Sequence, residues 1–215
     1  MGFFISLEGI EGCGKTTQLR LLADWLRAAD RQVLTTREPG GCPIADQIRA
    51  ILLAPQSQAL VPRAELLLYA AARAQHVDEV VSPALQAGKI VLCDRYTDAT
   101  LAYQGGGRGL DHALIIELNA MASAGLTPQL TLLLDLPVEI GLGRASSRNQ
   151  TTADQEGRFE QESLDFHRRV QTAYRQLASA EPERFHLIDA NGSVEQVNQR
   201  IIAAVTAFLA DHCCP

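Results

Sequence analysis

Short, almost wholly apolar runs alternate along this chain with longer stretches in which apolar positions recur every three or four residues. The long stretches predict helices near residues 15–29, 43–53, 62–87, 111–123, 137–146, 160–180 and 193–211. The short runs predict strands at residues 3–7, 32–36, 89–93, 130–135 and 185–188. Strands that are apolar along their whole length are typical of a parallel sheet covered on both faces. We therefore predict an α/β fold in which a five-stranded parallel sheet lies between two layers of helices.

One segment departs from this pattern. Between Ser146 and Gly157 the only apolar residue is Ala153, so the segment cannot bury itself and is expected to be a mobile surface loop. Arg144, Arg148 and Arg158 flank this segment or lie within it. It is either a disordered connection between two helices or a lid that closes over phosphate groups and excludes water.

Composition narrows the class of protein. A chain of 215 residues with 47% hydrophobic residues fits a single domain with a large core. No apolar stretch approaches the ~20 residues of a membrane span, and no signal-peptide pattern begins the chain, so we expect a soluble, cytoplasmic protein without a membrane partner. The net charge of −6 argues against a nucleic-acid partner but is compatible with a small phosphorylated ligand. The five cysteines form no C-x-x-C pair, so neither a disulfide framework nor a zinc site is predicted.

A glycine-rich stretch directly follows the first predicted strand and opens the first predicted helix. Residues 9–16 have the pattern G-x-x-x-x-G-K-T. In such a P-loop the glycines let backbone N–H groups surround an anion, the lysine reaches the β- and γ-phosphates, and the hydroxyl contacts Mg²⁺. The alternative is a plain strand-to-helix turn with a surface lysine, but Lys15 is one of only two lysines, with Lys89. The predicted nucleotide-binding residues are Gly9, Ile10, Glu11, Gly12, Cys13, Gly14, Lys15, Thr16 and Thr17.

Three predicted strands end in, or run directly into, an aspartate. These are Asp94, Asp135 and Asp189, and the carboxyl ends of parallel strands gather at the edge of the sheet where ligands bind. Asp94 is the best candidate for a magnesium contact because Arg95 and a polar segment follow it at once. Asp135 is followed by Leu-Pro and Asp189 by Ala-Asn-Gly, which are typical of a helix entry and a turn.

Four sequence motifs, and the order in which they occur, resemble those of the bacterial thymidylate kinases. They are EGIEGCGKTT (8–17), TREPGG (36–41), AAARAQH (70–76) and DRYTDATLAYQGGGRG (94–109), with FEQES (159–163) as a fifth. The resemblance covers nearly the whole chain. It implies one nucleoside monophosphate kinase domain over residues 1–215, with the three-layer fold of P-loop nucleoside triphosphate hydrolases and a mobile lid at about 144–160. It further implies transfer of the γ-phosphoryl group of ATP to dTMP with Mg²⁺, giving dTDP and ADP, and a homodimer.

The resemblance also implies which residues hold the acceptor nucleotide. Arg37 and Arg49 contact its phosphate, and a planar guanidinium suits such bidentate contacts. Tyr69 stacks on the thymine ring, and Arg73, one helical turn later, hydrogen-bonds its O4. Without the resemblance, Arg49 would be an exposed charge on an amphipathic helix and Tyr69 an aromatic residue of the core.

Five further positions acquire roles by the same resemblance. Arg95 reaches the acceptor phosphate and the transferring group. Thr100 and Gln104 contact the edge of the base, and Tyr103 packs against the sugar and disfavours a 2′-hydroxyl. Glu11 faces the 3′-hydroxyl, although by itself it could be a solvent-facing loop residue.

The expected chemistry needs no general base, because the attacking phosphate oxygen is already anionic. The five histidines are scattered without evident partners, which agrees with this. Catalysis then depends on alignment and on cations around the transferring group. The P-loop contains no arginine, so the lid must supply one, from Arg148 or Arg158, while Arg144 lies near the adenine or the phosphates.

Two other functions stay open at this point. One is a kinase for another pyrimidine monophosphate, since base specificity depends on a few contacts. The other is a P-loop ATPase that regulates partner proteins. A GTPase is excluded because neither lysine lies in an N-K-x-D motif.

Overall fold

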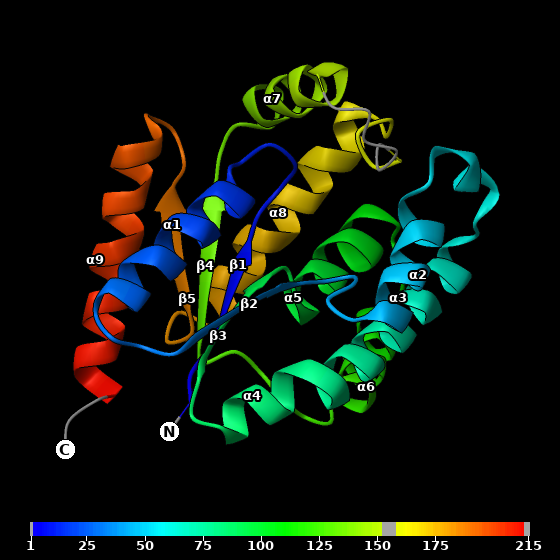
Figure 1. The fold of residues 1–215 in the computed structure, drawn as a ribbon. Coiled ribbons are helices and arrows are strands. Elements are labelled where there is room, and N and C mark those ends of the chain that lie inside the picture. The colour runs from blue at the N-terminus through cyan, green and yellow to red at the C-terminus, as the bar shows by residue number, and fades with distance from the viewer. Residues whose placement is uncertain (1, 152–157, 213–215) are drawn as a thin grey trace.

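The computed structural model describes residues 2–151 and 158–212, and it contains the predicted parallel sheet. The strands lie in the order β2-β3-β1-β4-β5 (Figure 1). Their bounds are β1 (Phe4–Glu8), β2 (Val33–Arg37), β3 (Ile90–Asp94), β4 (Leu130–Asp135) and β5 (Phe185–Asp189). All neighbouring strands pair in parallel, so the predicted strands are confirmed, each within one residue.

Helices cover both faces of the sheet, as predicted. In β1, Ile5 and Leu7 face one layer, formed by α1 (Lys15–Ala28) and α9 (Val194–His212). Phe4 and Glu8 alternate with them and face the other layer. That second layer contains α4 (Ser82–Gln86), which packs near Phe4, and α8 (Leu164–Ala180), whose Tyr174 contacts Glu8. The core therefore lies on both sides of β1, and the P-loop leaves the sheet at its centre.

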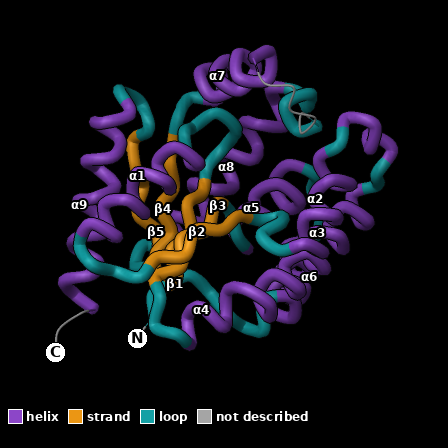
Figure 2. Tube along the Cα trace, in the orientation of Figure 1, coloured by secondary structure: helices purple, strands orange, loops and turns teal. Residues whose placement is uncertain are grey.

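A group of helices stands away from the sheet and forms one wall of the site. Figure 2 shows α2 (Pro43–Leu53), α3 (Pro62–His76) and α6 (His112–Ala122) lying together. A short 3₁₀ helix, η1 (Pro55–Ala59), joins α2 to α3. The predicted helix at 62–87 is α3 followed by a π-helical turn, η2 (Val77–Val81), and α4. Within the described residues, none of the helices has both the length and the apolar character that crossing a membrane requires.

The sequence prediction missed a helical segment after β3. Helix α5 (Thr97–Thr100) continues into η3 (Leu101–Gly107), which includes three consecutive glycines. A Cβ atom on Gly106 would lie 2.5 Å from the Cβ atom of Ala173, and one on Gly107 would lie 2.6 Å from the Phe166 ring. These glycines therefore serve close packing of η3 against α8, whereas in a sequence they are typical of a loop.

The segment predicted as a surface loop is partly helical. Helix α7 (Val138–Thr151) continues past residue 146, so the loop prediction is wrong for residues 146–151. Residues 152–157 of the predicted lid lie outside the described residues. Helix α7 touches the P-loop, since the space beside Gly12 is closed by the backbone of Gly141.

Candidate active site

The P-loop has the backbone geometry of an anion-binding loop. Gly9, Gly12 and Gly14 have φ values of 136°, 69° and 98°, a region that favours glycine. Helix α1 begins at Lys15, and no side chain caps its N-terminus. The N–H groups of its first turn are therefore available to a phosphate, and the helix dipole favours negative charge there.

The two functional side chains of the P-loop are held in place. Lys15 Nζ donates to the carbonyl oxygens of Gly9 at 3.0 Å and Ile10 at 2.9 Å. The hydroxyl of Thr16 donates to Asp94 Oδ2 at 2.8 Å. Oxygen atoms from a P-loop threonine and an aspartate at a strand end are the ligands that Mg²⁺ takes in P-loop proteins, so this pair fits such an ion.

The other two candidate aspartates have different partners. Asp135 pairs with Arg175 at 2.8 Å, and Asp189 pairs with Arg200 at 3.5 Å. Asp94 is therefore the strand-end aspartate that reaches the P-loop, and its contact with Mg²⁺ stays a prediction.

A cavity of about 880 Å³ opens beside the P-loop. Six cationic side chains line it, and such a concentration of positive charge suits anionic ligands. Most of the predicted site residues share this lining: Glu11, Gly12, Gly14, Lys15, Thr16, Thr17, Arg37, Arg49, Tyr69, Arg73, Asp94, Arg95, Thr100, Tyr103, Gln104 and Arg144. Gly9, Ile10, Cys13 and Arg158 do not, and the side chain of Arg148 lies outside what the structure describes.

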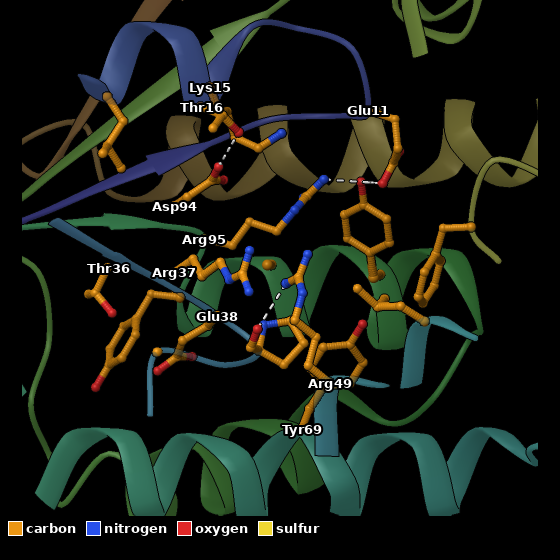
Figure 3. A pocket seen from close by; sticks show the side chains of 18 of the residues that line it. Glu11, Lys15, Thr16, Thr36, Arg37, Glu38, Arg49, Tyr69, Asp94 and Arg95 are labelled. Atoms are coloured by element: carbon orange, nitrogen blue, oxygen red, sulfur yellow. Dashed lines mark hydrogen bonds and ion pairs between the residues drawn. The ribbon is translucent and has the colours of Figure 1, made fainter. Parts of the chain in front are cut away.

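Arg37, Arg49 and Arg95 lie between the P-loop and Tyr69 (Figure 3). Arg49 donates to the carbonyl oxygen of Pro39 at 2.8 Å, and Arg37 pairs with Asp46 at 3.5 Å. Both guanidiniums thus lie at the TREPGG loop, on the side of the cavity opposite Lys15.

Arg95 joins the P-loop to this second cluster. Its backbone is left-handed, with φ at 68°, a strained conformation for a residue other than glycine and one that recurs at functional sites. Its guanidinium donates to the carbonyl oxygen of Gly9 at 2.9 Å and to Glu11 at 3.1 Å, and lies 4.7 Å from the centre of the Tyr103 ring. The strained backbone therefore directs a cation of the cavity lining toward Glu11 and Tyr103, beside the P-loop.

Glu11 is mostly buried, so the solvent-facing alternative is wrong. Its Oε1 accepts a bond from the Tyr103 hydroxyl at 2.6 Å, and His167 Nδ1 lies 3.2 Å from its Oε2 without hydrogen-bond geometry. Burial by itself would raise the pKa of Glu11, but the charges of Arg95 and Lys15 and the hydrogen bond from Tyr103 lower this pKa well below its usual range. Glu11 is therefore a carboxylate at neutral pH and can accept a hydrogen bond from a sugar hydroxyl.

Arg73 is the centre of a buried polar network. It donates to Glu38 at 2.7 Å, Asn119 at 2.6 Å, Thr100 at 2.9 Å and the carbonyl oxygen of Tyr96 at 3.1 Å. A guanidinium has five N–H groups, so one N–H on Nη1 is left for a ligand. Sequence reasoning missed Glu38 and Asn119, because neither spacing nor residue type indicates which distant segments meet.

His76 also belongs to this network, which corrects the expectation that the histidines lack partners. It lies 2.6 Å from the Thr36 hydroxyl and 3.0 Å from Glu38, and it is fully buried. Its position in the AAARAQH motif was the only indication of a role. His76 braces the loop that carries Arg37.

Arg158, a candidate for contacting the transferring phosphoryl group, points away from the P-loop. It is buried, pairs with Glu65 at 2.7 Å and donates to the carbonyl oxygen of Leu52 at 3.2 Å. Glu65 also contacts Arg108. In this conformation Arg158 fastens the end of the predicted lid to helix α3 and does not reach the P-loop.

The fold, the P-loop with its Thr16–Asp94 pair, and a second arginine cluster in the same cavity define a P-loop protein that binds phosphorylated ligands. Residues 7–201 match the family described as thymidylate kinase. The chain is 59% identical to a thymidylate kinase of Geotalea uraniireducens, over 98% of this chain and 100% of the relative. It is 62% identical to one of Syntrophotalea carbinolica, over 94% of each. The crystal structure of thymidylate kinase from Ehrlichia chaffeensis superposes with a TM-score of 0.77 at 31% identity, covering 95% of this chain and 98% of that one. This chain belongs to the thymidylate kinase family.

Proposed function

We propose that this chain transfers the γ-phosphoryl group of ATP to dTMP, giving dTDP and ADP. The observation that carries the proposal is that one cavity joins the P-loop to the cluster of Arg37, Arg49, Tyr69 and Arg73. A single nucleotide site would need only the first half. Two anionic ligands can meet end to end here, with Arg95 between them.

The P-loop side is assigned to ATP. Backbone N–H groups of residues 9–17 and the Lys15 ammonium would bind its phosphates, and Arg144 would lie near the adenine or the phosphates. Thr16 and Asp94 would hold Mg²⁺, an ion that neutralises negative charge on the phosphate oxygens when bound.

The opposite side is assigned to dTMP. Arg37, Arg49 and Arg95 would hold its phosphate, and Tyr69, Arg73, Thr100 and Gln104 would contact the base. Tyr103 and Glu11 would contact the sugar. No histidine lines the cavity in the described parts of the chain, which suits a reaction whose nucleophile is already anionic and whose rate depends on alignment and charge.

The lid would complete the site. Arg148 and Arg158 are the candidates for the cation on the transferring group, since the P-loop has no arginine. For Arg158 this role requires that it leaves Glu65, so closure of the segment at 144–160 would exchange one carboxylate partner for a phosphate.

The decisive experiment mixes the protein, ATP, Mg²⁺ and dTMP and follows ADP and dTDP together. Equal amounts of both products support the proposal. ADP without dTDP would indicate a regulatory ATPase, and faster turnover of dUMP, CMP or GMP than of dTMP would indicate a kinase for another base. Omission of dTMP measures background hydrolysis.

The same proposal includes a homodimer. Large apolar side chains are exposed on the three adjoining helices α2, α3 and α6: Ile44, Ile51, Leu67, Leu114, Ile116 and Met121. A second copy of the chain would cover them, since large exposed apolar areas commonly mark interfaces. Sedimentation equilibrium should give twice the 23.3 kDa of one chain, and Ile116→Asp should shift the protein to the monomer.

A further inference from the structure

Glu65 on helix α3 is a fully buried carboxylate that touches the base-contacting side of the cavity. Its Oε1 accepts bonds from Gln104 Nε2 at 2.8 Å and Arg108 Nε at 3.2 Å. Its Oε2 accepts one from Arg108 Nη2 at 3.2 Å and pairs with Arg158 Nη1 at 2.7 Å. Guanidiniums donate and never accept, so the carboxylate in this position is an acceptor at both oxygens.

This arrangement determines which way the Gln104 amide faces. An amide has a donating and an accepting end, and only the NH₂ end can bond to an acceptor such as Glu65. The Oε1 atom of Gln104 therefore points away from Glu65, and it has no bonding partner within residues 2–151 and 158–212. Gln104 is itself nearly fully buried and lines the cavity, so Oε1 is available to a ligand there.

We propose that Glu65 is a positioning residue for base selectivity. It holds the Gln104 carbonyl toward the base, so the site accepts a hydrogen bond from a pyrimidine whose N3 carries hydrogen, as in thymine and uracil. Cytosine has an unprotonated N3, and its lone pair would face the lone pairs of Oε1. The inference rests on the proposed function, because it assumes that a pyrimidine nucleotide lies beside Gln104.

The test is the change Glu65→Gln, which keeps the side-chain volume but can either donate to or accept from Gln104. The Gln104 amide is then free to turn. Calorimetric Kd values for dTMP, dUMP and dCMP should show the dTMP preference over dCMP falling about tenfold, the size of one neutral hydrogen bond and its mismatch. The preference for dTMP over dUMP should not change, because both bases carry hydrogen on N3.

Glu162→Gln is the matched control. Glu162 pairs with Arg108 at 2.6 Å, in the same network, and no bond joins it to Gln104 in the described residues. The control should retain the wild-type preference over dCMP. A folded Glu65→Gln protein with an unchanged dTMP-to-dCMP ratio would overturn the inference.

Gln104→Met keeps the inference testable if Glu65→Gln does not fold. Methionine fills the same space without an amide. The affinity ratio of dTMP to dCMP should therefore fall as much as is expected for Glu65→Gln. An unchanged ratio in Gln104→Met would also overturn the inference. Failure of the wild-type protein to bind dTMP is a different result, since it would reject the proposed function itself.

Discussion

The P-loop half of the cavity is made of consecutive residues, whereas the half around Arg73 takes its side chains from segments far apart in the chain. Residues 9–16 offer mainly backbone N–H groups at a helix N-terminus. Arg73 on α3 instead contacts Glu38 after β2, Thr100 on α5 and Asn119 on α6. On the proposed assignment, local backbone would bind the ATP phosphates, whereas side chains brought together from distant segments would bind the base.

The difference has a consequence for stability. Removing one partner from a buried hydrogen-bond network lowers the free energy of unfolding. The remaining partner stays out of contact with water but has lost its hydrogen bond. The P-loop N–H groups can bond to water when no ligand is bound. Changes in the P-loop half should therefore affect catalysis with little effect on folding, and changes in the Arg73 half should affect both.

The largest effect is expected from the lid arginines. Loss of the arginine that contacts the transferring group should lower kcat by about 10³–10⁵-fold with little change in dTMP affinity. Arg148→Ala and Arg158→Ala, with the double variant, identify which residue it is. Arg158→Ala should also lower the unfolding midpoint, because Arg158 pairs with buried Glu65. Wild-type turnover in both single variants and in the double variant would show that the lid does not supply the arginine that contacts the transferring group.

Arg73→Met should destabilise the protein by about 3–5 kcal/mol, because it leaves Glu38 buried without its guanidinium partner. Urea unfolding followed by circular dichroism measures this, and dTMP affinity should fall in parallel. Arg27→Met removes an exposed pair with Asp24 and should cost no more than about 1 kcal/mol. If Arg73→Met lowered the free energy of unfolding as little as Arg27→Met does, the expected difference in stability between the two halves would be wrong.

The same contrast explains what could be predicted from the sequence. The strands and the P-loop follow from consecutive residues, and both were predicted. The partners of Arg73, and the roles of Glu65 and His76, depend on contacts between distant segments that periodicity does not contain. The helical segment that contains Gly105–Gly107 was not predicted, because the packing of Gly105 against α6 and of Gly106 and Gly107 against α8 is not visible in the sequence. The polar run at 146–151 likewise concealed the continuation of α7.

Lys15→Ala tests the P-loop half directly. Removing a positioned cation from a phosphate site should lower kcat/KM for ATP by about 10²–10³-fold, while the urea midpoint stays near that of wild type. Formation of ADP and dTDP measures kcat/KM, and urea unfolding curves give the midpoint. Lys89→Ala, the change at the only other lysine, should leave both unchanged. A loss of stability at Lys15 as large as that at Arg73 would contradict the distinction.

The smallest predicted effect concerns Glu8, a fully buried carboxyl group at the end of β1. It precedes the P-loop and accepts bonds from the Tyr174 hydroxyl and the Tyr96 N–H, each at 2.7 Å. Burial, with the negative charge of Asp98, raises the pKa of Glu8 from 4.5 to about 8 against the opposing effect of Arg95. The folded protein then binds this proton more tightly than the unfolded chain does. The stabilising contribution is complete below pH 4.5 and is lost as pH rises to about 8.

Glu8→Gln does not titrate, so it should lack this pH dependence. Between pH 5.5 and 7.5 the wild type should lose about 1 kcal/mol of unfolding free energy per pH unit relative to the variant, close to the limit for one proton. Urea unfolding at three pH values measures the difference, and exposed Glu183→Gln should follow the wild type at each. Parallel curves for wild type and Glu8→Gln would mean that Glu8 stays ionised in the folded protein.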